Sequence, residues 1–123
     1  MTTDRRQLLG IQGEDLACAE LQRRGYAILE RRYRTRYGEI DIVARDGEVT
    51  VFVEVKTRTG DGYGDAAEAV TPWKQRRIAH MSLDFVSRRR LHDRPCRFDV
   101  VAVDLTGPAP RVDVYTHAFD AYS

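Results

Sequence analysis

The stretch Val49–Lys56, which reads VTVFVEVK, decides the fold that we expect for this chain. Successive side chains of a strand point to opposite faces, so the four valines share one face and Phe52, Glu54 and Lys56 share the other. Its β-branched and aromatic residues favour a strand, and a strand that is apolar on both faces is typical of the centre of a sheet. The charged residues at its end need a partner or a metal ion, because burying an unpaired charge is costly.

The preceding segment, over residues 38–45, contributes a second carboxylate. The dipeptide Asp46-Gly47 separates it from the VTVFVEVK strand, and Asp-Gly between two apolar runs is a strong hairpin signal. If these two residues form the turn, Asp41 and Glu54 are diagonal neighbours on one face. Two carboxylates this close raise each other's pKa unless a cation lies between them.

Length and composition indicate one globular domain. The 123 residues suffice for a single layered core, and we expect one domain over residues 1–123. Hydrophobic content of 42% with 32% charged residues is typical of a folded, soluble protein. No apolar run approaches the roughly 20 residues of a membrane span, and the first residues lack the apolar stretch of a signal peptide. The isolated Cys18 and Cys96 indicate reduced thiols, so a cytoplasmic protein without a membrane partner is predicted.

Two helices flank the predicted strands. The first extends from a cap at Thr3 or Asp4 to about residue 24, and its inward stripe places Glu14 where a core residue is expected. The second begins at Thr71, followed by a proline, and extends to about residue 90 with Lys74 at the start of its inward stripe. Gly10 and Gly13, as small residues of the first helix, would let its backbone approach a neighbour.

Further strands are predicted over residues 26–33, 98–105 and 112–115, with an irregular tail from residue 116. A glycine-rich loop over residues 57–70 leaves the charged strand end and is a candidate substrate loop. The element order is αβββαββ. The second helix returns the chain so that residues 98–105 run parallel to residues 49–56. With one helix on each face, the sequence predicts a three-layer α/β/α sandwich around a mixed five-stranded sheet.

Four motifs occur in an order that resembles the bacterial YraN family across nearly the whole chain. They are Gly10-x-x-Gly13-Glu14, Gly38-Glu39-Ile40-Asp41, Phe52-Val53-Glu54-Val55-Lys56-Thr57-Arg58 and Arg97-Phe98-Asp99-Val100-Val101. Within them, Asp41 followed by Glu54-Val55-Lys56 is similar to the acid, acid-x-Lys signature of the restriction-endonuclease-like nuclease superfamily. The YraN family is similar in its motifs to archaeal Holliday-junction resolvases, in which a helix acid joins the strand acids.

The resemblance implies a metal-dependent nuclease that hydrolyses phosphodiester bonds in DNA, junction and branched DNA included, without sequence readout. Asp41, Glu54 and the Val55 carbonyl would hold Mg²⁺, with Mn²⁺ as an alternative, and Glu14 would hold a second metal or a bound water. Lys56 would polarise the attacking water or stabilise charge on the phosphate. Because such resolvases work as dimers, a homodimer is a candidate assembly.

Basic residues are expected to contact the nucleic-acid backbone, which positions a substrate without reading its sequence. The candidates are Arg34, Arg36, Arg58, Lys74 and Arg77, in addition to arginine clusters over residues 23–36 and 88–97. The chain departs from the YraN pattern at Arg32, where members of the family commonly carry Asn.

Two alternatives to the nuclease remain open from the sequence. A nucleic-acid-binding module of the same fold with little turnover would keep the same surface. A purely structural interpretation pairs Glu54 with Lys56 along the strand and has Asp41 cap a turn, and such surface pairs are common. The three histidines lie outside the acidic cluster and have no predicted role.

Overall fold

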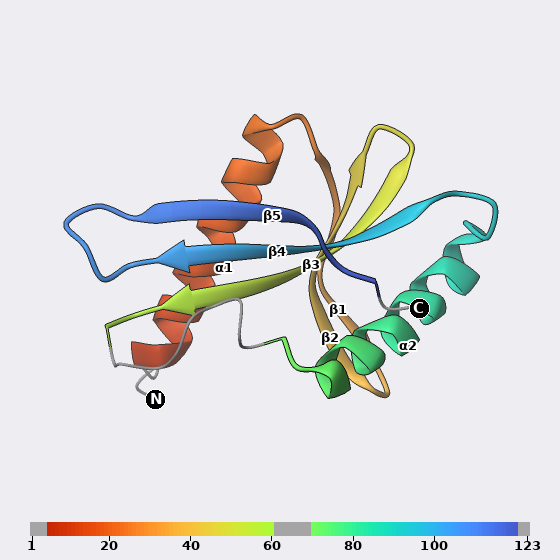
Figure 1. Cartoon of the computed structure of the whole chain (residues 1–123), viewed down its shortest axis with the longest axis horizontal. Helices are drawn as coiled ribbons and strands as arrows, with labels where there is room; N and C mark the ends of the chain where they lie inside the picture. The colour runs from red at the N-terminus through yellow and green to blue at the C-terminus, as the bar shows by residue number, and fades with distance from the viewer. Residues whose placement is uncertain (1–4, 61–69, 121–123) are drawn as a thin grey trace.

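The computed structural model describes residues 5–60 and 70–120, and these form two helices and five strands (Figure 1). In chain order they are α1 (Arg5–Arg23), β1 (Ala27–Thr35), β2 (Gly38–Asp46), β3 (Val49–Arg58), α2 (Pro72–Arg89), β4 (Cys96–Asp104) and β5 (Arg111–Phe119). The strands form one sheet in the order β1-β2-β3-β4-β5, in which β3 and β4 are parallel and the other neighbours antiparallel. The predicted αβββαββ order, with VTVFVEVK as the central strand, is confirmed.

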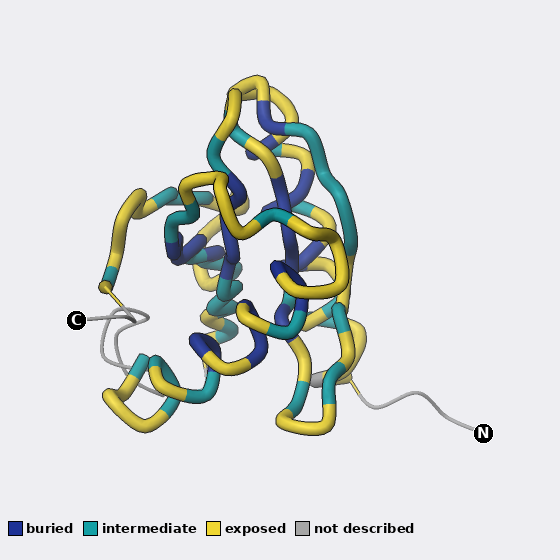
Figure 2. Tube along the Cα trace, turned by 90° about the vertical axis from the view of Figure 1, so that its right-hand side faces the viewer, coloured by how far each residue is buried: buried dark blue, intermediate teal, exposed yellow. Residues whose placement is uncertain are grey.

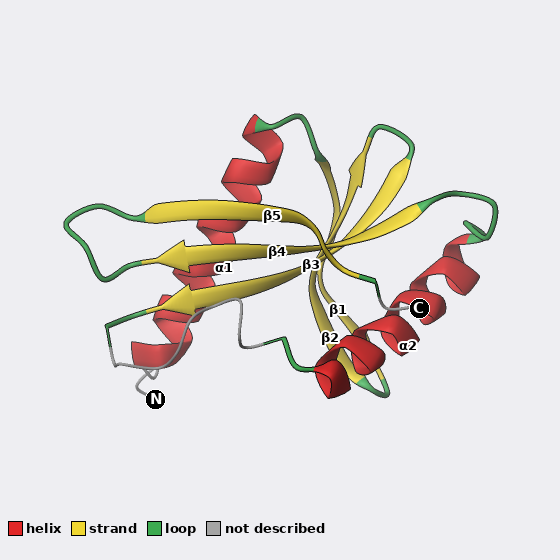
Figure 3. Ribbon diagram, viewed as in Figure 1, coloured by secondary structure: helices red, strands yellow, loops and turns green. Residues whose placement is uncertain are grey.

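The two faces of β3 support two separate cores. Val51 and Val53 pack with buried residues of α1, whereas Phe52 packs with buried residues of α2. The helices therefore cover opposite faces of the sheet, as predicted for an α/β/α sandwich (Figure 3). Figure 2 shows the buried positions concentrated between the outer layers. Cys18 belongs to the α1 core and Cys96 packs against the α2 core, and no disulfide joins them.

The β2–β3 hairpin differs from the prediction by two residues. The prediction places Asp46 and Gly47 in the turn, which would pair Arg45 with Glu48. In the structure Asp46 pairs with Val49, so residues 47 and 48 form the turn. The reason is a glycine with φ of 62° at the first central position, a conformation that hairpin turns require and that glycine adopts without strain. A shift of two residues leaves each side chain on its predicted face, so the prediction that acids of β2 and β3 share a face is unaffected.

β5 is longer than predicted, because the expected irregular tail continues the strand to residue 119. Between the pairs Val100–Tyr115 and Phe98–Phe119, β5 carries two more residues than β4. His117 lies in this interval with φ of 52°. The interval is mostly exposed and polar, which explains why the alternation of a strand is absent from its sequence.

The predicted start of α2 is confirmed, because the Thr71 hydroxyl accepts a hydrogen bond from the Lys74 N–H at 3.2 Å. The predicted caps of the first helix, Thr3 and Asp4, lie outside the described residues, as do residues 61–69 of the loop predicted over residues 57–70. The first two residues of that predicted loop belong instead to β3, which continues to Arg58. In the part of the chain that the structure covers, no helix has the length and apolar character needed to cross a bilayer.

α1 approaches β3 closely at Gly13, where a Cβ atom would lie 2.0 Å from Oγ1 of Thr57. Gly10, one turn earlier, is exposed and such an atom would have no neighbour within 4 Å, so the predicted close approach holds at Gly13 only. We predict that Gly13→Ala lowers the free energy of unfolding by about 1–3 kcal/mol through overpacking. Gly10→Ala should raise it by up to about 1 kcal/mol, because alanine favours a helix. Urea unfolding of both variants measures the difference, and equal effects would contradict it.

Candidate active site

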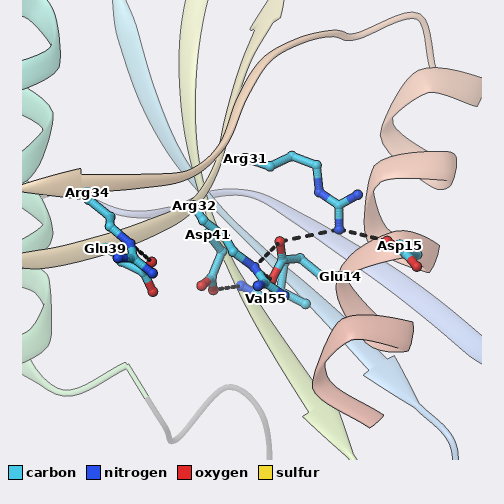
Figure 4. A network of polar contacts seen from close by, with 8 residues as sticks. All are labelled: Glu14, Asp15, Arg31, Arg32, Arg34, Glu39, Asp41 and Val55. Carbon is cyan, nitrogen blue, oxygen red and sulfur yellow. Dashed lines mark hydrogen bonds and ion pairs between the residues drawn. The ribbon is translucent and has the colours of Figure 1, made fainter. Parts of the chain in front are cut away.

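The candidate active site lies where β2 separates from β3. Their paired residues end at Ile42 and Val53, and the next residue of β2 is Asp41. Its carboxylate accepts a hydrogen bond from the Val55 N–H at 2.8 Å (Figure 4). Ile40 packs in the α2 core and Ile42 in the α1 core, although residues two apart in a strand normally share a face. The alternation of β2 is therefore interrupted at Asp41.

Asp41 and Glu54 converge, as the sequence predicted. Both side chains line one cavity, and the Glu54 side chain is only 16% exposed. Burial, followed by the charge of Glu54, raises the pKa of Asp41 from 3.8 to about 7, although the Val55 N–H acts in the opposite direction. The repulsion between two close carboxylates opposes ionisation of both. A cation bound between them offsets this repulsion and stabilises both ionised forms.

Two lysines also contact Glu54. Lys56 Nζ lies 3.3 Å and Lys74 Nζ 3.8 Å from Oε1 of Glu54. The adjacent Lys56 ammonium and partial burial lower the pKa of Lys74. The ion pair between Glu54 and Lys56 that a structural role would require is thus present. The other half of that interpretation is wrong, because Asp41 bonds to a strand N–H and caps no turn.

A cavity of about 340 Å³ opens beside these charges, within the size range of ligand sites. Four of the predicted site residues line it, namely Asp41, Glu54, Lys74 and Arg77. The carboxylates come from β2 and β3, whereas both cationic side chains come from the first two turns of α2. The cavity therefore has one acidic and one basic wall, an arrangement suited to an anion bound together with a cation.

Glu14 reaches the same region from α1, in the opposite layer. It is 8% exposed, and its carboxylate lies 3.3 Å from Arg31 Nη2 and 3.2 Å from Arg32 Nε (Figure 4). Its charge contributes to the raised pKa of Asp41. Because the Glu14 oxygens bind two guanidinium groups, a role as a metal ligand would require these groups to move away.

The contact between Arg32 and Glu14 depends on an unusual backbone conformation. Arg32 has φ of 53°, which interrupts the alternation of β1 and lets two consecutive arginines reach one carboxylate. Positive φ is uncommon outside glycine, and Asn adopts it several-fold more often than most residues. The backbone therefore suits the Asn that the YraN resemblance leads us to expect at this position, and Arg32 instead forms an ion pair with Glu14.

The donor atoms around Asp41 and Glu54 fit a hard cation. Within residues 5–60 and 70–120, no group of three or more His, Cys, Asp or Glu side chains is arranged to hold a metal ion. Mg²⁺, however, is usually bound through one or two carboxylates, with waters and substrate phosphates in the other positions. A pair of carboxylates that lines a cavity together with basic residues matches this mode of binding.

The other predicted nucleic-acid contacts lie outside the cavity lining. Arg34 binds Glu39 at 2.9 Å on the surface, and Arg36 donates to the Tyr37 hydroxyl at 2.9 Å. Arg58 is exposed at the end of β3. Of the five predicted contact residues, the structure thus brings only the two on α2 to the acidic pair.

A second polar cluster, on the α1 side of β4, surrounds Asp99. This residue is fully buried and accepts hydrogen bonds from Arg97 at 2.9 and 3.0 Å, from the Tyr26 hydroxyl at 3.3 Å and from the His117 N–H at 2.9 Å. Arg97 also reaches Asp46 at 3.2 Å. The carboxylate raises the pKa of Arg97, and burial raises that of Tyr26. Arg97 is therefore a structural residue and is unavailable to bind nucleic acid.

Comparison with known proteins supports the resemblance found in the sequence. The model of the uncharacterised protein family UPF0102 matches residues 13–103, which include Asp41, Glu54, Lys56 and Asp99. A UPF0102 protein of Geobacter sulfurreducens is 50% identical over 115 residues, or 93% of this chain and 90% of that protein. A UPF0102 protein of Rhodococcus opacus is 47% identical over 93% of this chain and 95% of that protein. One of Dehalococcoides mccartyi is 42% identical over 92% of this chain and 93% of that protein. The chain therefore belongs to the uncharacterised protein family UPF0102.

Proposed function

We propose that this protein is a cytoplasmic, metal-dependent nuclease of the restriction-endonuclease-like superfamily that hydrolyses phosphodiester bonds in DNA. The observation that carries the proposal is the convergence of Asp41 and Glu54 at one cavity, where Glu54 also contacts Lys56 and Lys74. The raised pKa of Asp41 supports the proposal, because carboxyl groups whose pKa is shifted by burial and by a neighbouring acid are concentrated at functional sites. The order of elements and the position of both acids on adjacent strands agree with the superfamily signature.

The proposed ligands of Mg²⁺ or Mn²⁺ are Asp41, Glu54 and the Val55 carbonyl. When bound, the ion would activate water and neutralise charge that develops on the phosphate. Lys56, which lies 3.3 Å from Glu54, would stabilise negative charge on the phosphate in the transition state. Lys74, on the opposite wall of the cavity, would bind a phosphate oxygen and keep the backbone in place.

The substrate proposed for this site is DNA held through its phosphates, with no sequence readout. The basic wall of the cavity offers ammonium and guanidinium groups, which bind phosphate oxygens independently of the base. Branched and junction DNA are the candidate substrates, and a homodimer would match the two-fold symmetry of a four-way junction.

One observation favours the second candidate, a nucleic-acid-binding module with little turnover. Glu54 is already neutralised by Lys56 and Lys74, and the described residues hold no three-acid group. Such a site could bind a phosphate backbone without a metal ion. The two candidates differ in whether a divalent cation is needed and whether the DNA is cut.

Incubation with labelled four-way-junction, flap and linear duplex DNA tests the proposal. We expect cleavage with Mg²⁺ or Mn²⁺ and none with a chelator. Asp41→Ala and Glu54→Ala should each reduce the cleavage rate by at least about 100-fold, because each removes a proposed ligand of the metal ion that would activate water and stabilise charge on the phosphate. Far-ultraviolet circular dichroism would confirm that these variants fold.

The matched control is Asp93→Ala, which removes an exposed carboxylate from the loop between α2 and β4 and should leave cleavage unchanged. DNA binding without cleavage under every divalent cation would support the binding module. If the protein neither binds nor cleaves DNA, that result would support the structural interpretation of the Glu54–Lys56 pair.

A further inference from the structure

Two exposed aromatic side chains lie together beside the candidate active site. Tyr37 is 40% exposed and Trp73 is 60% exposed. Both line a second cavity of about 510 Å³, whose other lining residues are Arg76, Arg77 and His80. Single exposed apolar residues are ordinary, but this lining consists only of aromatic and basic side chains. An occupant with flat rings and negative charge would complement it.

Much of Trp73 is accessible to solvent. The Arg77 guanidinium lies 5.2 Å from the centre of its ring. Trp73 is nevertheless 60% exposed, so this contact leaves a large part of the side chain accessible to a ligand. Across the cavity, Tyr37 packs beside His80 with ring centroids 5.4 Å apart and adds a second aromatic wall.

Arg77 connects this cavity to the candidate active site, because it lines both. Its Nε donates to the Tyr37 carbonyl at 2.5 Å. A Cβ atom at Gly38 would lie 2.2 Å from its Nη2, so the absence of a side chain there makes room for the guanidinium. The aromatic cavity is therefore held in a defined position relative to Asp41 and Glu54.

We propose that this cavity binds an unpaired base of a DNA strand, which stacks on Trp73 while Arg76 and Arg77 contact the adjacent phosphates. Stacking on aromatic side chains beside basic groups is the common mode of single-strand binding, and it tolerates every base. A base inside a duplex is stacked on both sides and offers no face to an indole. The inference rests on the proposed nuclease function and names its substrate class, which is DNA with unpaired nucleotides next to the cleaved bond.

The chain contains one tryptophan, so intrinsic tryptophan fluorescence reports on this cavity alone. The protein is titrated in chelator with a single-stranded oligonucleotide of about 12 nucleotides, within the usual site size, and with a hairpin duplex of equal nucleotide number. We expect the single strand to quench Trp73 strongly and the duplex to quench it weakly. Trp73→Ala should weaken single-strand binding about tenfold, measured by fluorescence anisotropy of a labelled oligonucleotide, with duplex binding within about twofold.

Trp73→Phe keeps an aromatic face and should retain most of the single-strand affinity. Leu83→Ala is the matched control, because Leu83 is 49% exposed on the same helix and outside the cavity lining. Equal quenching by the duplex would overturn the proposal. So would fluorescence that changes with protein concentration alone, since a second copy would then cover Trp73.

The outcome is separable from that of the cleavage assay. Cleavage that depends on Asp41, with unchanged single-strand binding in Trp73→Ala, would reject the base-binding cavity and keep the nuclease. Single-strand quenching of Trp73, without cleavage in any divalent cation, would keep the cavity and reject the nuclease.

Discussion

The Asp41→Asn variant is expected to be inactive as a nuclease and more stable than the wild-type protein at pH 8. The side chains have the same shape, and the Asn oxygen can accept from the Val55 N–H. The variant therefore keeps this hydrogen bond and removes the repulsion between two carboxylates. Measured by urea unfolding in chelator at pH 8, the gain should be about 1–3 kcal/mol.

The direction of the pH dependence follows from the raised pKa of Asp41. With a pKa of about 7 in the folded protein and an ordinary value of 3.8, Asp41 stays protonated in the folded state while the unfolded chain has already released its proton. The folded state then binds more protons, so the stability contributed by Asp41 is full below about pH 4 and is lost as the pH rises through 7. The advantage of Asp41→Asn should therefore be largest at pH 8, smaller at pH 5 and absent below about pH 4.

Metal binding supplies the second readout for this variant. Addition of Mg²⁺ at pH 8 should raise the Tm of the wild-type protein, because a ligand that binds only the folded state stabilises it. The Tm of Asp41→Asn should not respond, and its cleavage rate should fall at least about 100-fold. Asp93→Asn makes the same change of charge at an exposed position and should alter none of these properties. A variant that is less stable than wild type at both pH values would contradict the repulsion between Asp41 and Glu54.

The largest loss of stability is expected for Asp99→Ala. Its carboxylate is fully buried and pairs with Arg97, whose side chain is only 18% exposed. Removing one partner of a buried ion pair costs about 3–5 kcal/mol, and Arg97 would keep only the more exposed Asp46 as an acidic partner. It also leaves the Tyr26 hydroxyl and the His117 N–H without this acceptor. A domain of this size is stable by about 5–15 kcal/mol, so much of the total would be lost.

The chain contains a matched control for this prediction. Arg111 and Asp113 have the same two-residue spacing in a strand, and their Nε–Oδ2 distance is 3.0 Å, but their side chains are 76% and 41% exposed. Asp113→Ala should change the free energy of unfolding by less than about 1 kcal/mol. If Asp99→Ala is insoluble, Tyr26→Phe, which removes one hydroxyl from the cluster, should still cost about 1 kcal/mol. Equal effects of the Asp99 and Asp113 changes would show that burial of the pair is unimportant.

The convergence of Asp41 and Glu54 could be predicted from the sequence because it depends only on which face of the sheet each side chain occupies. A strand with period two assigns each side chain to a face, and an error of two residues in the register does not alter that assignment. The register itself depends on the conformation of a single turn residue, Gly47, and the Asp-Gly signal does not specify which pair of residues is central.

The partners of Glu14 could not be predicted, because they depend on a backbone conformation that no pattern indicates. Strand alternation would direct Arg31 and Arg32 to opposite faces, and positive φ is uncommon for arginine. The Asn of the YraN pattern at this position was the one available signal. The Asp99 cluster had a different signal, namely an arginine and an aspartate two residues apart at the start of a buried strand. Side chains with that spacing share a face, and burial then requires that they pair.

The irregular interval of β5 has a consequence for how copies of this protein can assemble. β5 is an edge strand, and edge strands offer unpaired backbone groups to other chains. At His117, however, the backbone turns its N–H inward to Asp99 and the two additional residues distort the edge. The irregular interval therefore disfavours continuous sheet extension along β5, and association of copies at this edge would depend on side-chain contacts.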